Sequence, residues 1–229
     1  IEVLSISLYV LVSFRYTSRI SLRGGVTYLV LAGVGSAFLV FGSALIFATY
    51  GSLDIAELQA GALAAAMPLL GMFGYGMFLV GVGFKLAATP FHMWAPDVYE
   101  AAPTSAAGVI ASASKGATVA ALLPFAFLLN SHFLVLTLLS GASMVIGNLL
   151  GLRETRVKRI LAYSSVAHVG YLLLGFAAIR SATPEALPAT MDAWSAIVFY
   201  IAVYGFSVLG AFTAIGALRT QTVVSLNDL

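Results

Sequence analysis

Six long runs of apolar residues, almost free of charge, are the feature that most constrains this chain. Only 9% of its residues are charged, whereas 61% are hydrophobic. A soluble domain is about 45–50% apolar and roughly 25% charged, and a helix that spans a bilayer needs roughly 20 mostly apolar residues. The chain is therefore predicted to be an all-α polytopic transmembrane helix bundle. Its full spans are expected at residues 26–49, 63–88, 104–129, 132–152, 157–180 and 193–218.

Two shorter apolar segments do not fit a full span. Residues 1–14 are too few to cross a bilayer, and we expect them to be the second part of a helix. The chain begins with Ile1 and stops at Leu229, just after a predicted helix. We therefore expect it to be truncated at both ends.

The other short segment, residues 89–101, is interrupted by prolines. Pro90, Pro96 and Pro103 bound or divide it. Because proline lacks a backbone donor and clashes with the preceding turn, we predict one broken helix over about 63–101. Broken backbone survives in lipid only where it is buried in protein or lines a wet cavity.

Positive charges gather in two of the predicted loops. Cytoplasmic loops carry an excess of Lys and Arg, so we expect both loops to face the cytoplasm. Four spans, an even number, separate them, and the broken piece should therefore add no full crossing. The basic residues are Arg15, Arg19 and Arg23 in the first loop, and Arg153, Arg156, Lys158 and Arg159 in the second.

Several classes of function are excluded by composition. The chain has no cysteine, so disulfides, thiolate zinc sites and cysteine-ligated iron–sulfur clusters are ruled out. The net charge of +2 is too small to indicate nucleic-acid binding. No phosphate loop or dinucleotide fingerprint is present, so we expect no cofactor in this chain.

Two lysines lie within or at the edge of apolar runs. Lys85 comes shortly before the break at Pro90; a helix C-terminus favours a cation there, although the side chain could also snorkel to the interface. Lys115 lies near the middle of 104–129, where a charge costs about 2.5–3.5 kcal/mol. Since burial disfavours the charged form of an amine, both are candidate proton-transfer residues. For Lys115 the alternative is a structural lysine locked to one carboxylate.

The neighbours of Lys115 suggest a polar stripe. Ser112 and Thr118 lie three residues before and after it, and Ser105 and Gly108 extend the pattern. Residues at this spacing share a helix face. We expect this face to meet protein or water, not lipid.

Three carboxylates are possible partners for the lysines. Glu2 is the only acidic residue within an apolar run, and it is the natural charge partner for one of them. Asp97 and Glu100, on the broken piece, compete with it. For these two the alternative is a solvated loop charge.

A histidine adds a further candidate. His168 lies in mid-span with Ser164, Ser165 and Tyr171 predicted on the same helix face. Histidine titrates near neutral pH and can relay protons, although it could equally be a satisfied core residue. Tyr200, Tyr204 and Ser207 form another polar stripe, which could hold water or cross-link helices.

Glycines crowd the third run, and we expect them to allow close helix packing. They are Gly71, Gly74, Gly76, Gly81 and Gly83. No other role is predicted for them.

The motifs now assembled resemble one family over nearly the whole chain: the N-type antiporter-like membrane subunit of respiratory complex I, the proton-pumping NADH–quinone oxidoreductase. The Pro-Phe-His-Met-Trp-Ala-Pro-Asp-Val-Tyr string is specific, because M- and L-type subunits and sodium/proton antiporter subunits tend to differ there. The matching segments are Leu4–Tyr9, Phe84–Leu86, Pro90–Tyr99, Ala102-Pro103, Ala113–Lys115 and Lys158–Tyr171.

The resemblance implies a pair of inverted five-helix repeats, each with one broken helix. Residues 1–129 would be the later part of the first repeat, and residues 130–229 the beginning of the second. Glu2 would match a glutamate of helix five, Lys85 the lysine of broken helix seven, and Lys115 the central lysine of helix eight. His168 would lie on helix ten. A further family lysine, in a second broken helix, is expected beyond Leu229.

The function implied by the resemblance is proton translocation coupled to redox chemistry in other subunits. NADH, FMN, iron–sulfur clusters and quinone are expected there, not in this chain. Partners would be the M-type, K-type and other membrane subunits in a bilayer, most simply a bacterial plasma membrane. Two alternatives stay open: a subunit of a sodium/proton antiporter, and a non-conducting scaffold subunit in which the charges only lock helices together.

Overall fold

The chain folds into a bundle of long helices. The computed structural model describes every residue except 1, 59–67, 127–132, 180–186 and 219–229, and the described part contains no strand. The elements are α1 (Glu2–Val12), α2 (Arg19–Tyr50), α4 (Leu69–Leu86), a 3₁₀ turn η1 (Phe91–Met93), α5 (Trp94–Ala101), α6 (Thr104–Val109), a π-helical turn η2 (Ile110–Ser114), α7 (Lys115–Leu122), a 3₁₀ turn η3 (Leu123–Phe125), α9 (Phe133–Gly151), α10 (Val157–Ala178) and α11 (Leu187–Ala217).

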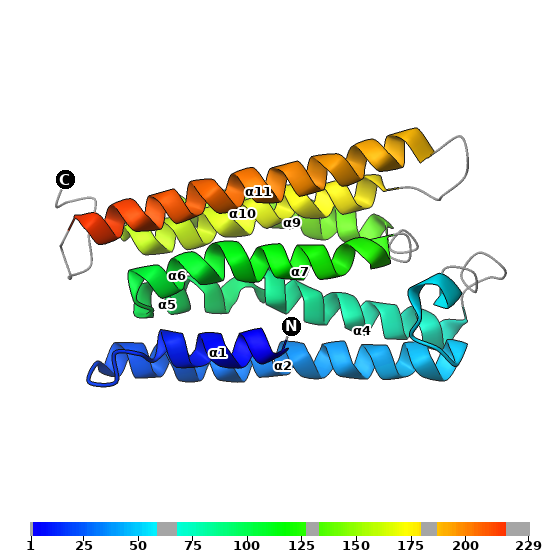
Figure 1. Cartoon of the computed structure of the whole chain (residues 1–229), viewed down its shortest axis with the longest axis horizontal. Coiled ribbons are helices and arrows are strands. Elements are labelled where there is room, and N and C mark those ends of the chain that lie inside the picture. The colour runs from blue at the N-terminus through cyan, green and yellow to red at the C-terminus, as the bar shows by residue number, and fades with distance from the viewer. Residues whose placement is uncertain (1, 59–67, 127–132, 180–186, 219–229) are drawn as a thin grey trace.

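The helices run roughly along the long axis of the molecule in three tiers (Figure 1). The α1/α2 pair forms one side, the α4–α7 segments lie in the middle, and α9, α10 and α11 form the other side. Six described helices are long and apolar enough to cross a membrane. The six predicted spans are thus confirmed as helices, while their ends at 63–67, 127–129, 132 and 180 lie outside the described residues.

Two predicted boundaries are wrong by about two turns. Helix α11, expected to begin at residue 193, begins at Leu187. The helix expected to begin at Val26 begins at Arg19. Ser18 caps it by accepting a hydrogen bond from the Ser21 backbone N–H at 3.4 Å, as N-cap serines do. Arg19 and Arg23, expected in a loop, therefore occupy its first turns. The apolar pattern missed these turns because a long helix can extend its charged end beyond the apolar core of the bilayer.

The break falls where the prolines predict it, and the two halves of the broken helix make one crossing. Helix α4 ends at Leu86, and Ala87 takes a left-handed conformation with φ of 60°. Helix α5 then continues toward the same end of the bundle (Figure 1), so that Leu69–Ala101 forms one candidate span. The expectation that the broken piece adds no crossing is confirmed. Both basic segments, at the starts of α2 and α10, accordingly lie at one end of the bundle.

Two hydrogen bonds hold the backbone around the break. The indole Nε1 of Trp94 donates to the Phe84 carbonyl at 2.9 Å, and the Thr89 backbone N–H donates to Ser143 Oγ of α9 at 2.9 Å. Trp94 and Ser143 are buried. The broken backbone is thus enclosed in protein, as the cost of unpaired polar groups in lipid requires.

Glycines bring α2 and α4 into close contact. A Cβ on Gly81 would lie 2.7 Å from the Gly35 carbonyl oxygen, and one on Gly42 would lie 2.5 Å from the Phe78 backbone nitrogen. The predicted packing role is confirmed for Gly81, and Gly74 faces the same contact. Gly76 faces open space instead, so not every glycine of the run contributes.

Candidate functional site

Lys115 is enclosed in the middle of the bundle. It follows the π-helical turn at Ile110–Ser114 and is 1% exposed. Its ammonium donates to the backbone carbonyl of Ser165 at 3.3 Å and also to the Ser165 hydroxyl. Single π turns are frequent at functional sites. Both contacts come from α10, a helix far away in the sequence.

The hydrogen bonds continue from Ser165 to the broken helix. Ser165 Oγ lies 3.4 Å from the hydroxyl of Tyr99, and either atom can be the donor. Tyr99 belongs to α5 and is fully buried. The cluster of Lys115, Ser165 and Tyr99, which we call the lysine cluster, therefore joins α7, α10 and α5.

The polar stripe predicted around Lys115 faces protein at Ser112 and Thr118, as expected, although neither hydroxyl bonds to the lysine. The Ser112 hydroxyl donates to the Gly108 carbonyl, and the Thr118 hydroxyl donates to the Ser114 carbonyl. Both side chains are buried, but both are satisfied within their own helix. Ser105 is exposed. A helical wheel with a 3.6-residue period does not hold across the π turn, because that turn contains an extra residue.

Lys85 turns toward the opposite side of the bundle. Its ammonium donates to Ser5 Oγ of α1 at 2.6 Å, which disagrees with a side chain that snorkels to the interface. Glu2 precedes Ser5 by one helical turn on α1, but its side chain lies outside the described ones. The Glu2–Lys85 pair therefore stays a prediction. No hydrogen bond in the described part of the chain joins the two lysines.

Asp97 and Glu100 are partners of arginines, so their expected pairing with Lys85 or Lys115 is wrong. Arg159 contacts Asp97 at 2.6 Å and Glu100 at 3.2 Å, and Arg156 also pairs with Glu100. Arg159 additionally bonds Glu154 at 2.9 Å. The reason is topological, since α5 ends beside the start of α10. We call these five residues the surface ion cluster.

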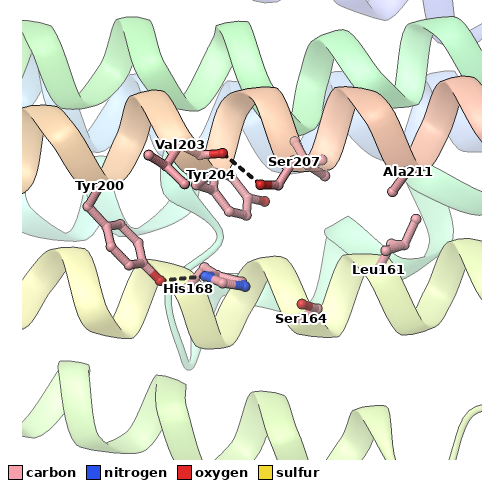
Figure 2. Close-up of a pocket in the computed structure, with 9 residues that line it drawn as sticks. Leu161, Ser164, His168, Tyr200, Val203, Tyr204, Ser207 and Ala211 are labelled. Atoms are coloured by element: carbon pink, nitrogen blue, oxygen red, sulfur yellow. Dashed lines mark hydrogen bonds between the residues drawn. The ribbon is translucent and has the colours of Figure 1, made fainter.

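His168 lines a cavity of about 220 Å³ between α10 and α11. Figure 2 shows its Nδ1 bonded to the hydroxyl of Tyr200 on the facing helix. Ser164 and Tyr204 also line this space, and the buried Tyr204 hydroxyl has no hydrogen-bond partner in the described part of the molecule. The predicted polar stripe of Tyr200, Tyr204 and Ser207 therefore lines a cavity and also links helices. Ser165, expected on the His168 face, bonds to Lys115 instead.

Sequence reasoning missed Tyr99 and the role of Ser165. In the sequence, Tyr99 stands within the motif that marks the broken helix, and no pattern there indicates a contact with Lys115. A tyrosine fully enclosed among apolar residues usually finds a partner for its hydroxyl, and this was the available signal. The groups around Lys115 are hydroxyls and a carbonyl, and the described residues include no cluster of His, Asp or Glu able to hold a metal ion.

The fold and the site define a polytopic membrane protein with a broken helix and a lysine buried in its interior. The chain belongs to the NADH:quinone oxidoreductase/Mrp antiporter transmembrane family, whose profile matches residues 1–229.

The resemblance to the N-type subunit is confirmed by its relatives. NADH-quinone oxidoreductase subunit N of Nitrosospira multiformis is 43% identical over 182 residues, covering 76% of this chain and 36% of that protein. The same subunit of Desulforamulus reducens is 39% identical, covering 97% and 46%. The chain thus spans less than half the length of these curated relatives.

Solved structures support the same fold. Respiratory complex I from Thermus thermophilus contains a chain that matches with a TM-score of 0.76 and 34% identity, covering 93% of this chain and 44% of that one. A chain of the archaeal membrane-bound sulfane sulfur reductase matches with a TM-score of 0.82 and 27% identity, covering 99% and 46%. An Mrp complex chain from Dietzia sp. matches with a TM-score of 0.75 at 24% identity, covering 88% and 36%, which is a likeness of fold alone. The predicted antiporter-like fold is confirmed.

Proposed function

We propose that this chain is part of a proton-translocating N-type membrane subunit of an NADH–quinone oxidoreductase, with Lys115 as its central proton-transfer residue. The observation that carries the proposal is the surroundings of Lys115. Its buried ammonium meets only oxygens of Ser165, and no carboxylate in the described part of the chain forms an ion pair with it. A nearby carboxylate favours the charged form of an amine, whereas burial disfavours it. Held by neutral oxygens, Lys115 is suited to release a proton.

The proposed path runs from Glu2 and Lys85 to Lys115 and then to His168. Lys85 faces α1, the helix that carries Glu2. Lys115 contacts α10, the helix that carries His168. Ordered water would connect Lys85 with Lys115, and repulsion between like charges on neighbouring sites would drive proton release.

The redox chemistry belongs to partners in this proposal. NADH, FMN, iron–sulfur clusters and quinone would be bound by other subunits, and M-type and K-type subunits would be among the membrane neighbours. The membrane would be a bacterial plasma membrane, in keeping with the bacterial relatives, with the basic end of the bundle in the cytoplasm. Residues 1–129 and 130–229 would belong to successive inverted repeats.

Replacing Lys115 tests the function directly. In the assembled complex, reconstituted in vesicles, Lys115→Ala should lower redox-driven proton translocation by about ten-fold or more, because a proton-transfer group contributes at least this much. Arg153→Ala is the control, since Arg153 is an exposed loop cation. Normal pumping by an assembled Lys115→Ala complex would exclude the role of Lys115.

The same vesicles separate the two alternatives. Sodium-dependent transport without any redox partner would support an antiporter subunit. Replacing Lys85 and Lys115 together by methionine should abolish pumping under our proposal. A scaffold subunit would instead keep pumping, or would lose assembly without a selective transport defect.

A further inference from the structure

Within the described structure, the Lys115 ammonium donates to two oxygens, and both belong to Ser165. The Ser165 carbonyl oxygen lies 3.3 Å from Nζ, and Oγ is its second acceptor. Ser165 and Lys115 are each 1% exposed, so bulk water does not compete for these bonds. The two oxygens differ in chemistry, because a carbonyl only accepts whereas a hydroxyl both accepts and donates.

The hydroxyl of Ser165 can therefore serve either form of the lysine. When Lys115 is charged, the Ser165 hydroxyl accepts a hydrogen bond from the ammonium and can donate its own hydrogen to the Tyr99 hydroxyl. Toward a neutral amine it can turn and donate to the nitrogen lone pair, and the Tyr99 hydroxyl can then donate to Ser165 Oγ. The 3.4 Å separation of these hydroxyls allows either direction.

We propose that Ser165 and Tyr99 are positioning residues that keep Lys115 in one place in both of its protonation states, by reversing the direction of their hydrogen bonds. This inference rests on the proposed function, since it assigns work to the two hydroxyls only if Lys115 gains and loses protons. No covalent bond is made or broken in the reversal, which needs only rotation of the two hydroxyl groups.

Other hydroxyls near the lysine cluster do not share this arrangement. Ser112 and Thr118 donate to carbonyls of their own helix. The Tyr204 hydroxyl lies near Ser165 but meets hydrogen-bond geometry with no partner in the described structure. Ser140 is as buried as Ser165, but it donates to the Gly170 carbonyl, at 2.7 Å, in the contact between α9 and α10. Ser140 is therefore a matched control for removing a buried serine hydroxyl beside α10.

The titratable groups on the elements around Lys115 must be considered in any pH experiment. They are Tyr99 on α5, His168 on α10, Tyr200 and Tyr204 on α11, and Lys85 on α4. The Lys85 ammonium bonds to Ser5 on the far side of the bundle. All of these groups are retained in the Ser165 and Ser140 variants, so a difference between those variants reports on the contact of Lys115 with Ser165.

The test is the pH profile of redox-driven proton translocation by the assembled complex. Ser165→Ala removes a hydroxyl whose bond to the charged ammonium is stronger than its bond to the neutral amine, so the alkaline limb of the profile should move to lower pH by about one unit, the difference between the two bonds. Ser165→Thr keeps the hydroxyl, so the alkaline limb of its profile should lie at the wild-type pH. Tyr99→Phe keeps the ring and should give a smaller shift in the same direction. Ser140→Ala should give none.

Each outcome is decisive for one part of the proposal. The positioning role of Ser165 would be overturned if the alkaline limb of the assembled Ser165→Ala complex did not shift. It would also be overturned if Ser140→Ala shifted that limb equally. If Ser165→Ala fails to assemble, Tyr99→Phe carries the test, and an unshifted limb there overturns the arrangement. Normal pumping by Lys115→Ala is a different result, because it removes the proposed function itself.

Discussion

At the scale of residues, each of the two lysines donates a hydrogen bond to a serine on another helix of the bundle. Lys85 donates to Ser5 on α1, and Lys115 donates to Ser165 on α10. A hydroxyl can accept from an ammonium and donate to an amine. Both serines are therefore compatible with proton exchange at the lysine they contact. The apolar runs predicted the two lysines as candidates, but the serines were found only from tertiary contacts.

Removing the Ser5 hydroxyl should impair transport without unfolding the bundle. Ser5→Ala deletes a buried acceptor of Lys85, and loss of one hydrogen bond to a charged group costs about 1.5–3 kcal/mol. We expect pumping by the assembled complex to fall several-fold. Ser7→Ala is the control, since Ser7 is exposed on the same helix and bonds to the Val3 carbonyl. Equal rates for both variants would contradict this role for Ser5.

At the scale of elements, the broken helix and the glycine contact decide how the site is placed. Pro90 predicted where the helix breaks, and α4 ends within four residues of it, at Leu86. The sequence did not show that α5 would continue the crossing and carry Tyr99 toward Ser165. That result depends on α9, because the Thr89 backbone N–H at the break donates to Ser143 Oγ, and on α10, because Ser165 lies there beside Tyr99.

The contact between α2 and α4 should be destabilised when Gly81 is replaced by alanine, but not when Gly76 is. Gly81→Ala would place a methyl group 2.5 Å from Leu39 Cγ and 2.7 Å from the Gly35 carbonyl oxygen. Overpacking of this kind costs about 1–3 kcal/mol, so the variant should reduce the thermal stability of the complex. Gly76→Ala on the same helix meets nothing within 4 Å and should behave as wild type. Equal midpoints of thermal unfolding for Gly81→Ala and Gly76→Ala would disprove the packing role of Gly81.

At the scale of the whole molecule, the surface ion cluster fixes α5 against α10. Arg159 contacts Asp97 and Glu100 on α5, and Lys158 donates to the Ala102 carbonyl at 2.8 Å. These contacts hold the two helices that carry Tyr99 and Ser165. Asp97 and Glu100, expected as partners of Lys85 or Lys115, thus join two of the helices around Lys115.

Loss of Arg159 should loosen this alignment in a salt-dependent way. Arg159→Gln breaks three ion pairs with partly exposed partners, and exposed pairs are worth about 0.2–1 kcal/mol each. Thermal unfolding of the complex should shift to lower temperature by a few degrees, and the shift should shrink at high salt. Arg153→Gln is the control, because Arg153 makes no ion pair within the described residues. A shift unaffected by salt would contradict an electrostatic cause.

The sequence by itself determined that this chain is a helical membrane protein, where its spans lie, where one helix breaks, and which lysines lie within the spans. These properties follow from local composition, because lipid admits only long apolar helices and tolerates a charge or a broken backbone only inside protein. The tertiary structure alone decided the partners. Ser165 meets Lys115, and Arg159 meets Glu100, across long stretches of chain. Local spacing cannot predict such pairs, because they depend on how the helices pack and on the extra residue of the π turn before Lys115.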